Sequence, residues 1–334
     1  MQAIELTDDS HHRIRLTERP APVPGRGEVL IRVRAAALNH RDLEIRDGRY
    51  GMAVQRPLVP LSDAVGDVVE VGATTAGFAP GDRVIPTFFP TWIDGAFRSE
   101  YFASQLGSSV DGVLRELMVY PATGLVHAPS HLGDEAAALP IAALTAWSAL
   151  CDASLGPGQT LLVIGTGGVA LFAVQFARLF GARAIVVSSS DHKLARAMEL
   201  GAAHGVNYQR VPHWGAPVRD WSGGAGVDVV LELGGAATLP QSTVALRVGG
   251  TIAIVGYLTG PQLQLDLREL FIGKRARLRG QTVGSRRDFE AMNRALEWHR
   301  VVPVIDSRFA LSDTPAAYER MASGQALGKV LIAL

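Results

Sequence analysis

The stretch TLLVIGTGGVALFAVQFARLFGARAIVVSSS (160–190) decides the fold of this chain. An apolar strand runs into a glycine-rich turn, a helix follows as far as Gly181, and a second apolar strand comes next. The turn Gly165-Thr166-Gly167-Gly168-Val169-Ala170 fits the pattern G-x-G-x-x-G/A in the context that dinucleotide binding requires. Gly165 permits the tight turn, and Gly167 lets the backbone approach a pyrophosphate at the helix N-terminus. We expect a dinucleotide site here. The alternative is a glycine-rich turn without a ligand.

The residues after this stretch continue to alternate between strands and helices. Short apolar strands separated by helices of about ten residues indicate βαβ units and a parallel sheet. The expected helices are 191–201 and PQSTVALRVGG (240–250), and the expected strands are 182–188, 227–234 and 251–256.

The two ends of the chain have a different pattern of predicted strands and helices. The first 130 residues predict strands and turns, with β-branched runs such as EVLIRVRAAAL (28–38) and VGDVVEVG (65–72). A helical segment from Asp134 to Cys151 follows, and we expect it to be interrupted at Pro140. We expect a β-rich domain, 1–130, completed by 281–334, with a nucleotide-binding domain, 131–280, inserted. The last part predicts helices at 288–300 and 314–324 and strands at 303–306 and 328–334.

Composition excludes several classes of protein. The 334 residues hold 32 Lys+Arg against 32 Asp+Glu, so no global basic field exists to attract nucleic acid. Arg275, Arg277 and Arg279 alternate with apolar residues, which predicts a solvated strand face. The uncharged run 156–177 is long enough to span a bilayer, but its glycine-rich middle favours a turn. We expect a cytoplasmic protein that binds neither nucleic acid nor membrane.

The end of the second strand distinguishes between two cofactors. An acidic residue there would bind the adenosine ribose of NAD and repel a 2′-phosphate. This chain has Ser188-Ser189-Ser190 instead, followed by Lys193, which suits the phosphate of NADP. Asp191 does not suit it, although it can cap the next helix. We therefore favour NADP(H). The alternative is that the serines cap the helix and the pocket is indifferent to the phosphate.

With these residues in place, the whole chain resembles a medium-chain dehydrogenase/reductase of the quinone-oxidoreductase type. The resemblance implies an α/β protein with a GroES-like β-barrel catalytic domain and an inserted Rossmann-fold domain, as well as a homodimer. It rests on one ordered set of motifs: EVLIRVRAAALNHRDL (28–43), VGDVVEVG (65–72), GDRV (81–84), ALPIAALTAW (138–147), GTGGVA (165–170), LARAMELGA (194–202), ALRVGGTIAIVG (245–256) and GKVLI (328–332).

The chain departs from the zinc-dependent members of that superfamily at their metal ligands. Those members carry a catalytic Cys in the place of Asn39, a His in the place of Ser62 and a Glu in the place of Asp63, with a Cys or Asp near Ile141. Many also hold a structural zinc with four cysteines, whereas this chain has only Cys151. Zinc needs three or four ligands in fixed geometry, so we expect no zinc. The histidines, including the pair His11-His12, which we expect to be solvated, show no H-E-x-x-H pattern.

The resemblance also implies roles for individual residues. Tyr50 matches a tyrosine near the substrate and is expected to donate a hydrogen bond or proton; the alternative is a tyrosine packed in the barrel. Asn39 could bond the substrate oxygen or the nicotinamide carboxamide. Gly234, Gly256 and Tyr257 end later strands, at the edge where doubly wound sheets bind ligands. The remaining expected cofactor contacts are His40, Thr145, Tyr208 and Lys329.

Three functions follow as hypotheses. The leading one is a metal-free, NADP(H)-dependent reductase of a small hydrophobic quinone or α,β-unsaturated carbonyl. The second is an alcohol dehydrogenase or aldehyde reductase with an unrecognised metal site. The third is an NADPH-binding sensor or structural protein without turnover. The aromatic residues of segment 88–112 lie where zinc-binding relatives have their structural-zinc lobe. They either line a substrate pocket or pack together in a shortened form of that lobe.

Overall fold

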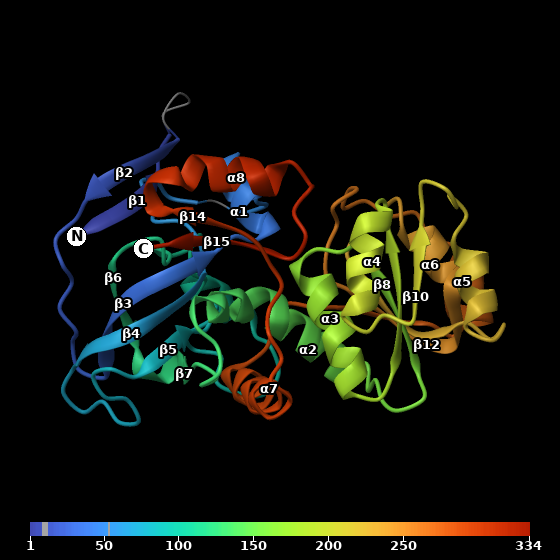
Figure 1. The fold of residues 1–334 in the computed structure, drawn as a ribbon, viewed down its shortest axis with the longest axis horizontal. Helices are drawn as coiled ribbons and strands as arrows, with labels where there is room; N and C mark the ends of the chain where they lie inside the picture. Colours follow the sequence, from blue (N-terminus) through green and yellow to red (C-terminus); the bar gives the residue numbers. More distant parts are fainter. Residues whose placement is uncertain (9–12, 53) are drawn as a thin grey trace. The chain divides into compact units, whose positions relative to one another are not determined.

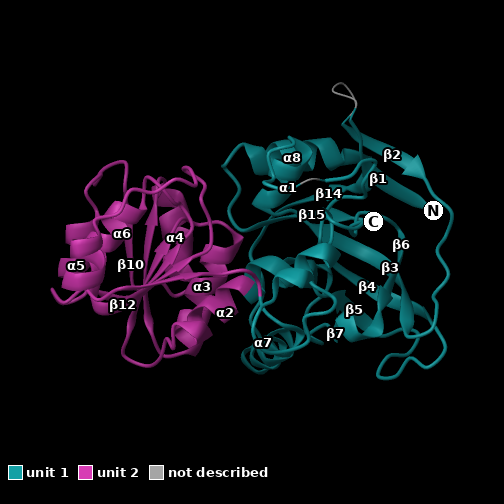
Figure 2. Ribbon diagram, turned by 180° about the vertical axis from the view of Figure 1, so that it is seen from behind, with its two compact units in different colours: residues 1–144, 284–334 teal, residues 145–283 magenta. Residues whose placement is uncertain are grey.

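The computed structural model describes residues 1–8, 13–52 and 54–334, so the pair His11-His12 lies outside the described residues. The chain forms two compact units: unit 1 comprises residues 1–144 and 284–334, and unit 2 comprises residues 145–283 (Figure 2). This division falls later in the chain than the expected edges at 130/131 and 280/281. At the first edge the difference arises because the 3₁₀ segment Asp134–Ala138 packs on β3, β4 and β15 of unit 1.

Unit 2 is a six-stranded, entirely parallel sheet. Its order is β10-β9-β8-β11-β12-β13, which is the order 3-2-1-4-5-6 of the Rossmann fold. The strand order reverses between the neighbours β8 and β11, where such sheets bind ligands at their carboxyl ends. The strands are β8 (Thr160–Ile164), β9 (Arg183–Ser188), β10 (His204–Asn207), β11 (Val227–Glu232), β12 (Leu246–Ile254) and β13 (Arg277–Gly280).

The helices of unit 2 pack against the strands that they connect (Figure 1). Of these helices, α3 contacts β8 and β9, α4 contacts β9 and β10, and α6 contacts β11 and β12. A π-helical turn, Arg268–Gly273, precedes β13. The helices are α2 (Leu144–Asp152), α3 (Gly168–Leu179), α4 (Asp191–Glu199), α5 (Gly215–Trp221) and α6 (Leu239–Ala245).

The expected helix 240–250 is wrong in its second half, because α6 ends at Ala245 and β12 begins at Leu246. The physical reason is a distant cation. The ammonium of Lys274 donates to the carbonyl oxygens of Thr243, Val244 and Leu246. It therefore satisfies the carbonyl groups that are left open at the end of a helix.

The expected helix from Asp134 to Cys151 is divided into three parts: the 3₁₀ segment Asp134–Ala138, the π-helical segment Leu139–Ala143 and α2. Pro140 lies within the π-helical segment, in keeping with the expected interruption. The expected strand 303–306 instead lies at Ile305–Ala310.

Unit 1 is built on a sheet of order β14-β15-β3-β4-β5-β7, in which β6 also pairs with β3. A separate antiparallel pair, β1 and β2, lies in the same unit, as do both ends of the chain (Figure 1). The C-terminal strand β15 pairs with β3, so the two ends of the sequence share one sheet. The strands are β1 (Gln2–Leu6), β2 (Ile14–Glu18), β3 (Glu28–Ala37), β4 (Asp63–Val71), β5 (Arg83–Pro86), β6 (Leu117–Pro121), β7 (Leu125–His127), β14 (Ile305–Ala310) and β15 (Lys329–Ala333).

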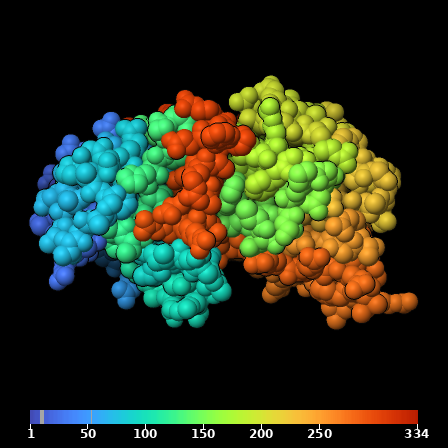
Figure 3. Space-filling view, turned by 90° about the horizontal axis from the view of Figure 1, so that it is seen from below, coloured from blue at the N-terminus to red at the C-terminus, as the bar shows by residue number. Residues whose placement is uncertain are grey.

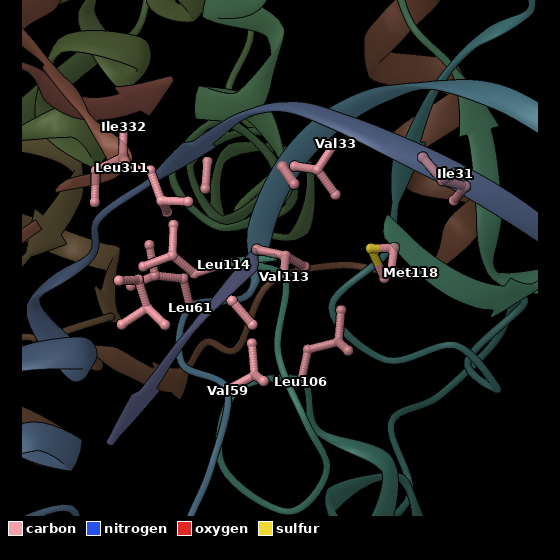
Figure 4. Packing of buried hydrophobic residues seen from close by; sticks show 14 of the residues in the cluster. Ile31, Val33, Val59, Leu61, Leu106, Val113, Leu114, Met118, Leu311 and Ile332 are labelled. Atoms are coloured by element: carbon pink, nitrogen blue, oxygen red, sulfur yellow. The ribbon is translucent and has the colours of Figure 1, made fainter. Parts of the chain in front are cut away.

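Among the described residues of unit 1, the α-helices that lie wholly within it are α1 (His40–Arg46), α7 (Arg286–His299) and α8 (Thr314–Ala322). The side chains of the sheet and of α8 enclose one core (Figure 4), in which β-branched residues of β3 and β15 meet leucines from other segments, such as Leu61 and Leu114. Short 3₁₀ turns occur at Ser99–Ser104, Ala122–Gly124 and Leu311–Asp313. Within the described ranges, no helix has both the length and the apolar character that a membrane crossing demands.

A buried carboxylate anchors the C-terminal part of unit 1. Asp306 accepts hydrogen bonds from Nε and Nη2 of Arg320, at 2.8 and 2.7 Å, and from the backbone N–H of Leu327 at 2.9 Å. The hydroxyl of Ser307 adds a fourth. Burial acts to raise the pKa of Asp306, but these hydrogen bonds outweigh it and lower the pKa to about 2. This network fixes the chain just before β15.

We predict that Asp306→Asn lowers the free energy of unfolding by about 2 kcal/mol at pH 7, because hydrogen bonds to a charged group are lost. The stabilisation is present above the unfolded pKa of about 3.9 and disappears as the pH falls through the folded value. Urea unfolding at several pH values should therefore show the two proteins converging toward pH 2. Glu319→Gln, on the exposed side of α8, serves as the control. A difference that is independent of pH would contradict the prediction.

Candidate functional site

The glycine-rich turn of unit 2 joins β8 to α3 and leaves an open cradle at the helix N-terminus. Gly165 has φ +91°, a left-handed conformation that favours glycine. A Cβ on Gly167 would meet no atom within 4 Å, so space is free beside the turn. No side chain caps the start of α3, and its first N–H groups are available to an anion. These features fit the pyrophosphate of a dinucleotide.

The strand β9 ends next to this turn. The hydroxyl of Ser188 is buried and lies 3.3 Å from that of Thr166, so two predicted cofactor residues meet. The backbone N–H of Tyr208 donates to the carbonyl oxygen of Ser188 at 3.0 Å. Ser190 caps α4 by accepting from the backbone N–H of Lys193 at 3.4 Å. Ser189 is half-buried between them. The expected capping role therefore falls to one serine of the three.

An exposed cluster beyond β9 includes a residue that the sequence analysis missed. Asp191 accepts hydrogen bonds from the amide of Asn207, at 2.8 Å, and from the guanidinium of Arg210. The carboxylate of Asp191, which by itself does not suit a phosphate, is thus paired with the guanidinium of Arg210. Arg210 follows Tyr208 by two residues and remains largely exposed. In the sequence, only the position of Arg210 shortly after a strand could have indicated that it lies near the candidate cofactor site.

Below the carboxyl end of β11, one buried carboxylate shapes the loop that carries Gly234. Glu232 is fully buried and accepts the backbone N–H groups of Gly234 and Gly235, at 2.8 and 3.1 Å. The hydroxyls of Thr238 and Ser242 donate to it as well. A Cβ on Gly256 would lie 2.6 Å from the carbonyl oxygen of Leu233, so glycine is required there. Of the other predicted residues, Tyr257 is exposed on the neighbouring loop and Thr145 is buried in α2.

In unit 1, Asn39 precedes α1, where β3 ends. Its backbone N–H donates to Asp42 at 2.7 Å, and its carbonyl oxygen accepts from the backbone N–H of Asp42 at 3.0 Å. Burial raises the pKa of Asp42 to about 6. These bonds fix the backbone at Asn39. His40 follows as the first residue of α1 and is exposed.

A buried ammonium faces the Asn39 side chain. The Nζ of Lys329, on β15, donates to the Oδ1 of Asn39 at 2.6 Å and lies 3.3 Å from the Oδ2 of Asp63. Lys329 is 3% exposed and Asp63 is completely buried. An ammonium can only donate, so the amide oxygen of Asn39 must face it. The amide nitrogen, Nδ2, is then a buried donor without a partner among the described residues.

The four positions at which zinc-dependent relatives hold their metal converge on this cluster. The hydroxyl of Ser62 donates to Asp63 at 3.3 Å, and the backbone N–H of Ile141 donates to the same carboxylate at 3.3 Å. A zinc ion prefers thiolate, imidazole and carboxylate ligands. Here it would find an amide, a hydroxyl and one carboxylate, two of them already bonded to Lys329. In residues 1–8, 13–52 and 54–334, no group of three or more His, Cys, Asp or Glu could hold a metal. These residues do not fit zinc.

Tyr50 lies after α1, within reach of two nitrogen donors. Nε2 of Gln105 donates to its hydroxyl at 2.6 Å, and Nε of Arg41 does so at 3.4 Å. The Arg41 guanidinium also lies 4.9 Å from the centre of the Tyr50 ring. Tyr50 is half-buried, so it is a packed residue and a candidate donor at once. Gln105 was not identified in the sequence analysis, because it lies among the aromatic residues of segment 88–112, where no polar motif indicates a functional side chain.

The aromatic residues of segment 88–112 pack against one another. The ring of Phe89 lies within 6.2 Å of those of Trp92, Phe97 and Phe102, centre to centre. This contact favours the interpretation as a packed lobe. The lobe adjoins the start of α7, because Arg286 donates its backbone N–H to Trp92, and both segments reach the surface (Figure 3).

Comparisons with known proteins identify relatives along the whole chain. The model of the alcohol dehydrogenase GroES-like domain matches residues 25–130, and that of the zinc-binding dehydrogenase matches residues 168–298. A zinc-type alcohol dehydrogenase-like protein of Schizosaccharomyces pombe is 40% identical over 314 residues, covering 92% of this chain and 90% of that protein. An acryloyl-coenzyme A reductase of Metallosphaera sedula is 32% identical over 322 residues, covering 93% of each.

A solved structure agrees with these matches. The crystal structure of a putative alcohol dehydrogenase from Sinorhizobium meliloti superposes with a TM-score of 0.93 and is 38% identical. The match covers 100% of this chain and 98% of that one. The two-unit architecture with its Rossmann sheet and GroES-like barrel is therefore confirmed.

We predict that Lys329→Met lowers the free energy of unfolding by about 3–5 kcal/mol, because Asp63 is left as a buried charge without its cation. The double variant Lys329→Met/Asp63→Asn should recover most of this loss, because the remaining amide is neutral. Urea unfolding of the wild type, both single variants and the double variant measures the coupling. Additive effects of the two substitutions would show that the ion pair does not stabilise unit 1 in this way.

Proposed function

The chain belongs to the medium-chain dehydrogenase/reductase superfamily, on its alcohol dehydrogenase-like side, and from this membership we propose a function for it as an oxidoreductase. We propose that it is a metal-free, NADP(H)-dependent reductase of a quinone or an α,β-unsaturated carbonyl. The observation that carries this proposal is the buried ammonium of Lys329. It holds the amide oxygen of Asn39 and leaves Nδ2 as an unused donor.

The cofactor half of the proposal rests on unit 2. The turn 165–170 and the N-terminus of α3 would hold the pyrophosphate. Ser188, Ser189, Lys193 and Tyr208 would surround the adenosine ribose and its 2′-phosphate, and Arg210 adds a guanidinium to this group. A bound NADPH supplies the hydride. Further contacts are proposed for His40, Thr145, Thr166, Gly234, Gly256, Tyr257 and Lys329.

The substrate half rests on unit 1. Reduction of a carbonyl compound places negative charge on an oxygen, which a metal ion would stabilise directly. Here the stabilising groups are neutral donors, Nδ2 of Asn39 and the hydroxyl of Tyr50. Such donors suit acceptors in which the charge is delocalised, namely quinones and carbonyls conjugated to an alkene. The acryloyl-coenzyme A reductase among the relatives acts, by its name, on a compound of the second kind.

A second candidate is an alcohol dehydrogenase or aldehyde reductase. It is favoured by the match of residues 168–298 to the zinc-binding dehydrogenase model and by the name of the Schizosaccharomyces pombe relative. The donor set around Asp63 weighs against the zinc-dependent form of that chemistry. For either activity we propose a homodimer, with β13 as the exposed edge strand through which two sheets join.

We predict that the purified protein oxidises NADPH with a quinone or an enone and is not inhibited by a chelator. A simple alcohol or aldehyde should react at least about 100-fold more slowly, because without a metal ion the localised charge is poorly stabilised. Spectrophotometry at the NADPH absorbance band, with and without chelator, measures this. Chelator-sensitive turnover of a plain alcohol would establish the second candidate instead. Tight NADPH binding without any turnover would support a sensor or structural role.

We predict that Ser188→Asp shifts the cofactor preference from NADP(H) toward NAD(H) by about 10- to 100-fold, because a carboxylate there repels a 2′-phosphate and accepts from the ribose. The ratio of kcat/KM for the two cofactors measures the shift. Asp220→Asn is the control, because it removes an exposed carboxylate of unit 2 on α5, away from the end of β9. An unchanged ratio in Ser188→Asp would mean that the ribose lies elsewhere.

A further inference from the structure

The hydroxyl of Tyr50 receives hydrogen bonds from two groups that can only donate in the arrangement observed. Nε2 of Gln105 lies 2.6 Å away and Nε of Arg41 lies 3.4 Å away. A phenol has one hydrogen and two acceptor positions. Both acceptor positions face nitrogen donors, so neither of these two bonds uses the hydrogen of the hydroxyl. That hydrogen is available to a third group.

The two donors are themselves held firmly. The guanidinium of Arg41 donates to the hydroxyl of Ser108 at 2.8 Å and to the carbonyl oxygen of Leu106 at 3.2 Å. It also lies 4.9 Å from the ring centres of both Tyr50 and Phe88. Arg41 is therefore fixed from several directions, and its Nε direction is fixed with it.

Gln105 is 2% exposed, and its Oε1 has no partner among the residues that the structure describes. A buried amide that leaves its own oxygen unpaired costs free energy. The compensating contact is the short bond from Nε2 to Tyr50. This bond fixes the Gln105 amide with its nitrogen directed at Tyr50.

We propose that Arg41 and Gln105 are positioning residues that hold the Tyr50 hydroxyl with its hydrogen directed to the substrate, so that Tyr50 supplies the proton of the reduction. This inference rests on the proposed function, because a reductase of that kind requires a proton at this step. Arg41 lies in the motif 28–43 that contains Asn39, but no role was assigned to Arg41 or to Gln105 in the sequence analysis.

The step balances for an α,β-unsaturated ketone. A bound NADPH, held by the residues of unit 2, would supply the hydride to the β-carbon, with its own C–H bond broken and NADP⁺ left behind. The electron pair of the alkene would then reside in an enolate. The O–H bond of Tyr50 breaks as its proton bonds to the enolate oxygen, which gives an enol that tautomerises to the saturated ketone. The electron pair stays on the phenolate oxygen, which already accepts from Gln105 and Arg41. A proton from water restores the phenol.

The first test removes the proton itself. Tyr50→Phe should lower kcat for an enone by about 100- to 1000-fold, with KM for NADPH unchanged. Tyr120→Phe is the matched control, because Tyr120 is a buried tyrosine of the same unit whose hydroxyl donates to the carbonyl oxygen of Thr87. The control should lose stability and keep its kcat. Equal kcat values for Tyr50→Phe and the wild type would overturn the proposal.

The second test reverses the direction of one hydrogen bond. A carboxylate can only accept, so Gln105→Glu would take the hydrogen of Tyr50 away from the substrate and lower kcat by about 100-fold. Gln105→Leu removes the donor without offering an acceptor and should lower kcat by about 10-fold, with an increased solvent isotope effect. If Tyr50 instead donated to the glutamine, Gln105→Glu would preserve the bond and the activity, and the proposal would be wrong.

The third test asks whether Gln105 and Arg41 act through Tyr50. In the Tyr50→Phe background, Gln105→Leu should change kcat less than twofold, because the group that it positions is gone. Arg41→Lys keeps the charge and loses the Nε donor, so it should lower kcat about 10-fold in the wild type and little in that background. Full additivity would make Gln105 and Arg41 structural residues and overturn the inference.

These experiments separate the inference from the function on which it rests. If the wild type reduces neither quinones nor enones, the proposed function fails, and the inference falls with it. If the wild type is active and the Gln105 and Tyr50 variants equal it, only the inference fails. NADPH affinity measured by fluorescence, in every variant, verifies that unit 2 is intact.

Discussion

One ammonium group, buried in unit 1, joins parts of the sequence that lie far apart. Lys329 enters on β15, which pairs with β3, and its Nζ reaches Asn39 at the end of β3 and Asp63 at the start of β4. Neither charge is easily removed alone, because a lone buried charge costs several kcal/mol. The same carboxylate accepts from Ile141, so it also orders the segment that leads into α2. The position and orientation of the Asn39 amide follow from this group.

Local features of the sequence predicted local features of the structure. The turn 165–170 was predictable because its strand, glycines and helix lie within a span of about 20 residues and each has its own signal. The parallel sheet of unit 2 was predictable from the alternation of strands and helices. The capping of α4 by Ser190 was open between alternatives until the bond to Lys193 was seen.

Features that depend on distant contacts were not predictable in the same way. The resemblance implied roles for Asn39 and Lys329 separately, but their bond spans 290 residues and has no pattern in the sequence. The end of α6 depends on Lys274, about 30 residues further on. Gln105 and Glu232 act through burial and hydrogen bonds, which composition and spacing do not reveal. Thus the fold was largely predictable from the sequence, whereas the polar contacts of the candidate site were predictable only between residues close together in the chain.

The insertion of unit 2 into unit 1 has a consequence for synthesis of the protein. Asp63 and Asn39 leave the ribosome long before Lys329, which follows Asp63 by 266 residues. During that interval the carboxylate has no ammonium to pair with, and β3 lacks the neighbour that β15 provides. Unit 2 is continuous in sequence and can fold in the meantime, as domains do during translation. Unit 1 is therefore completed last, and a nascent chain that has already formed the parallel sheet of unit 2 still lacks β15 and the ammonium of Lys329.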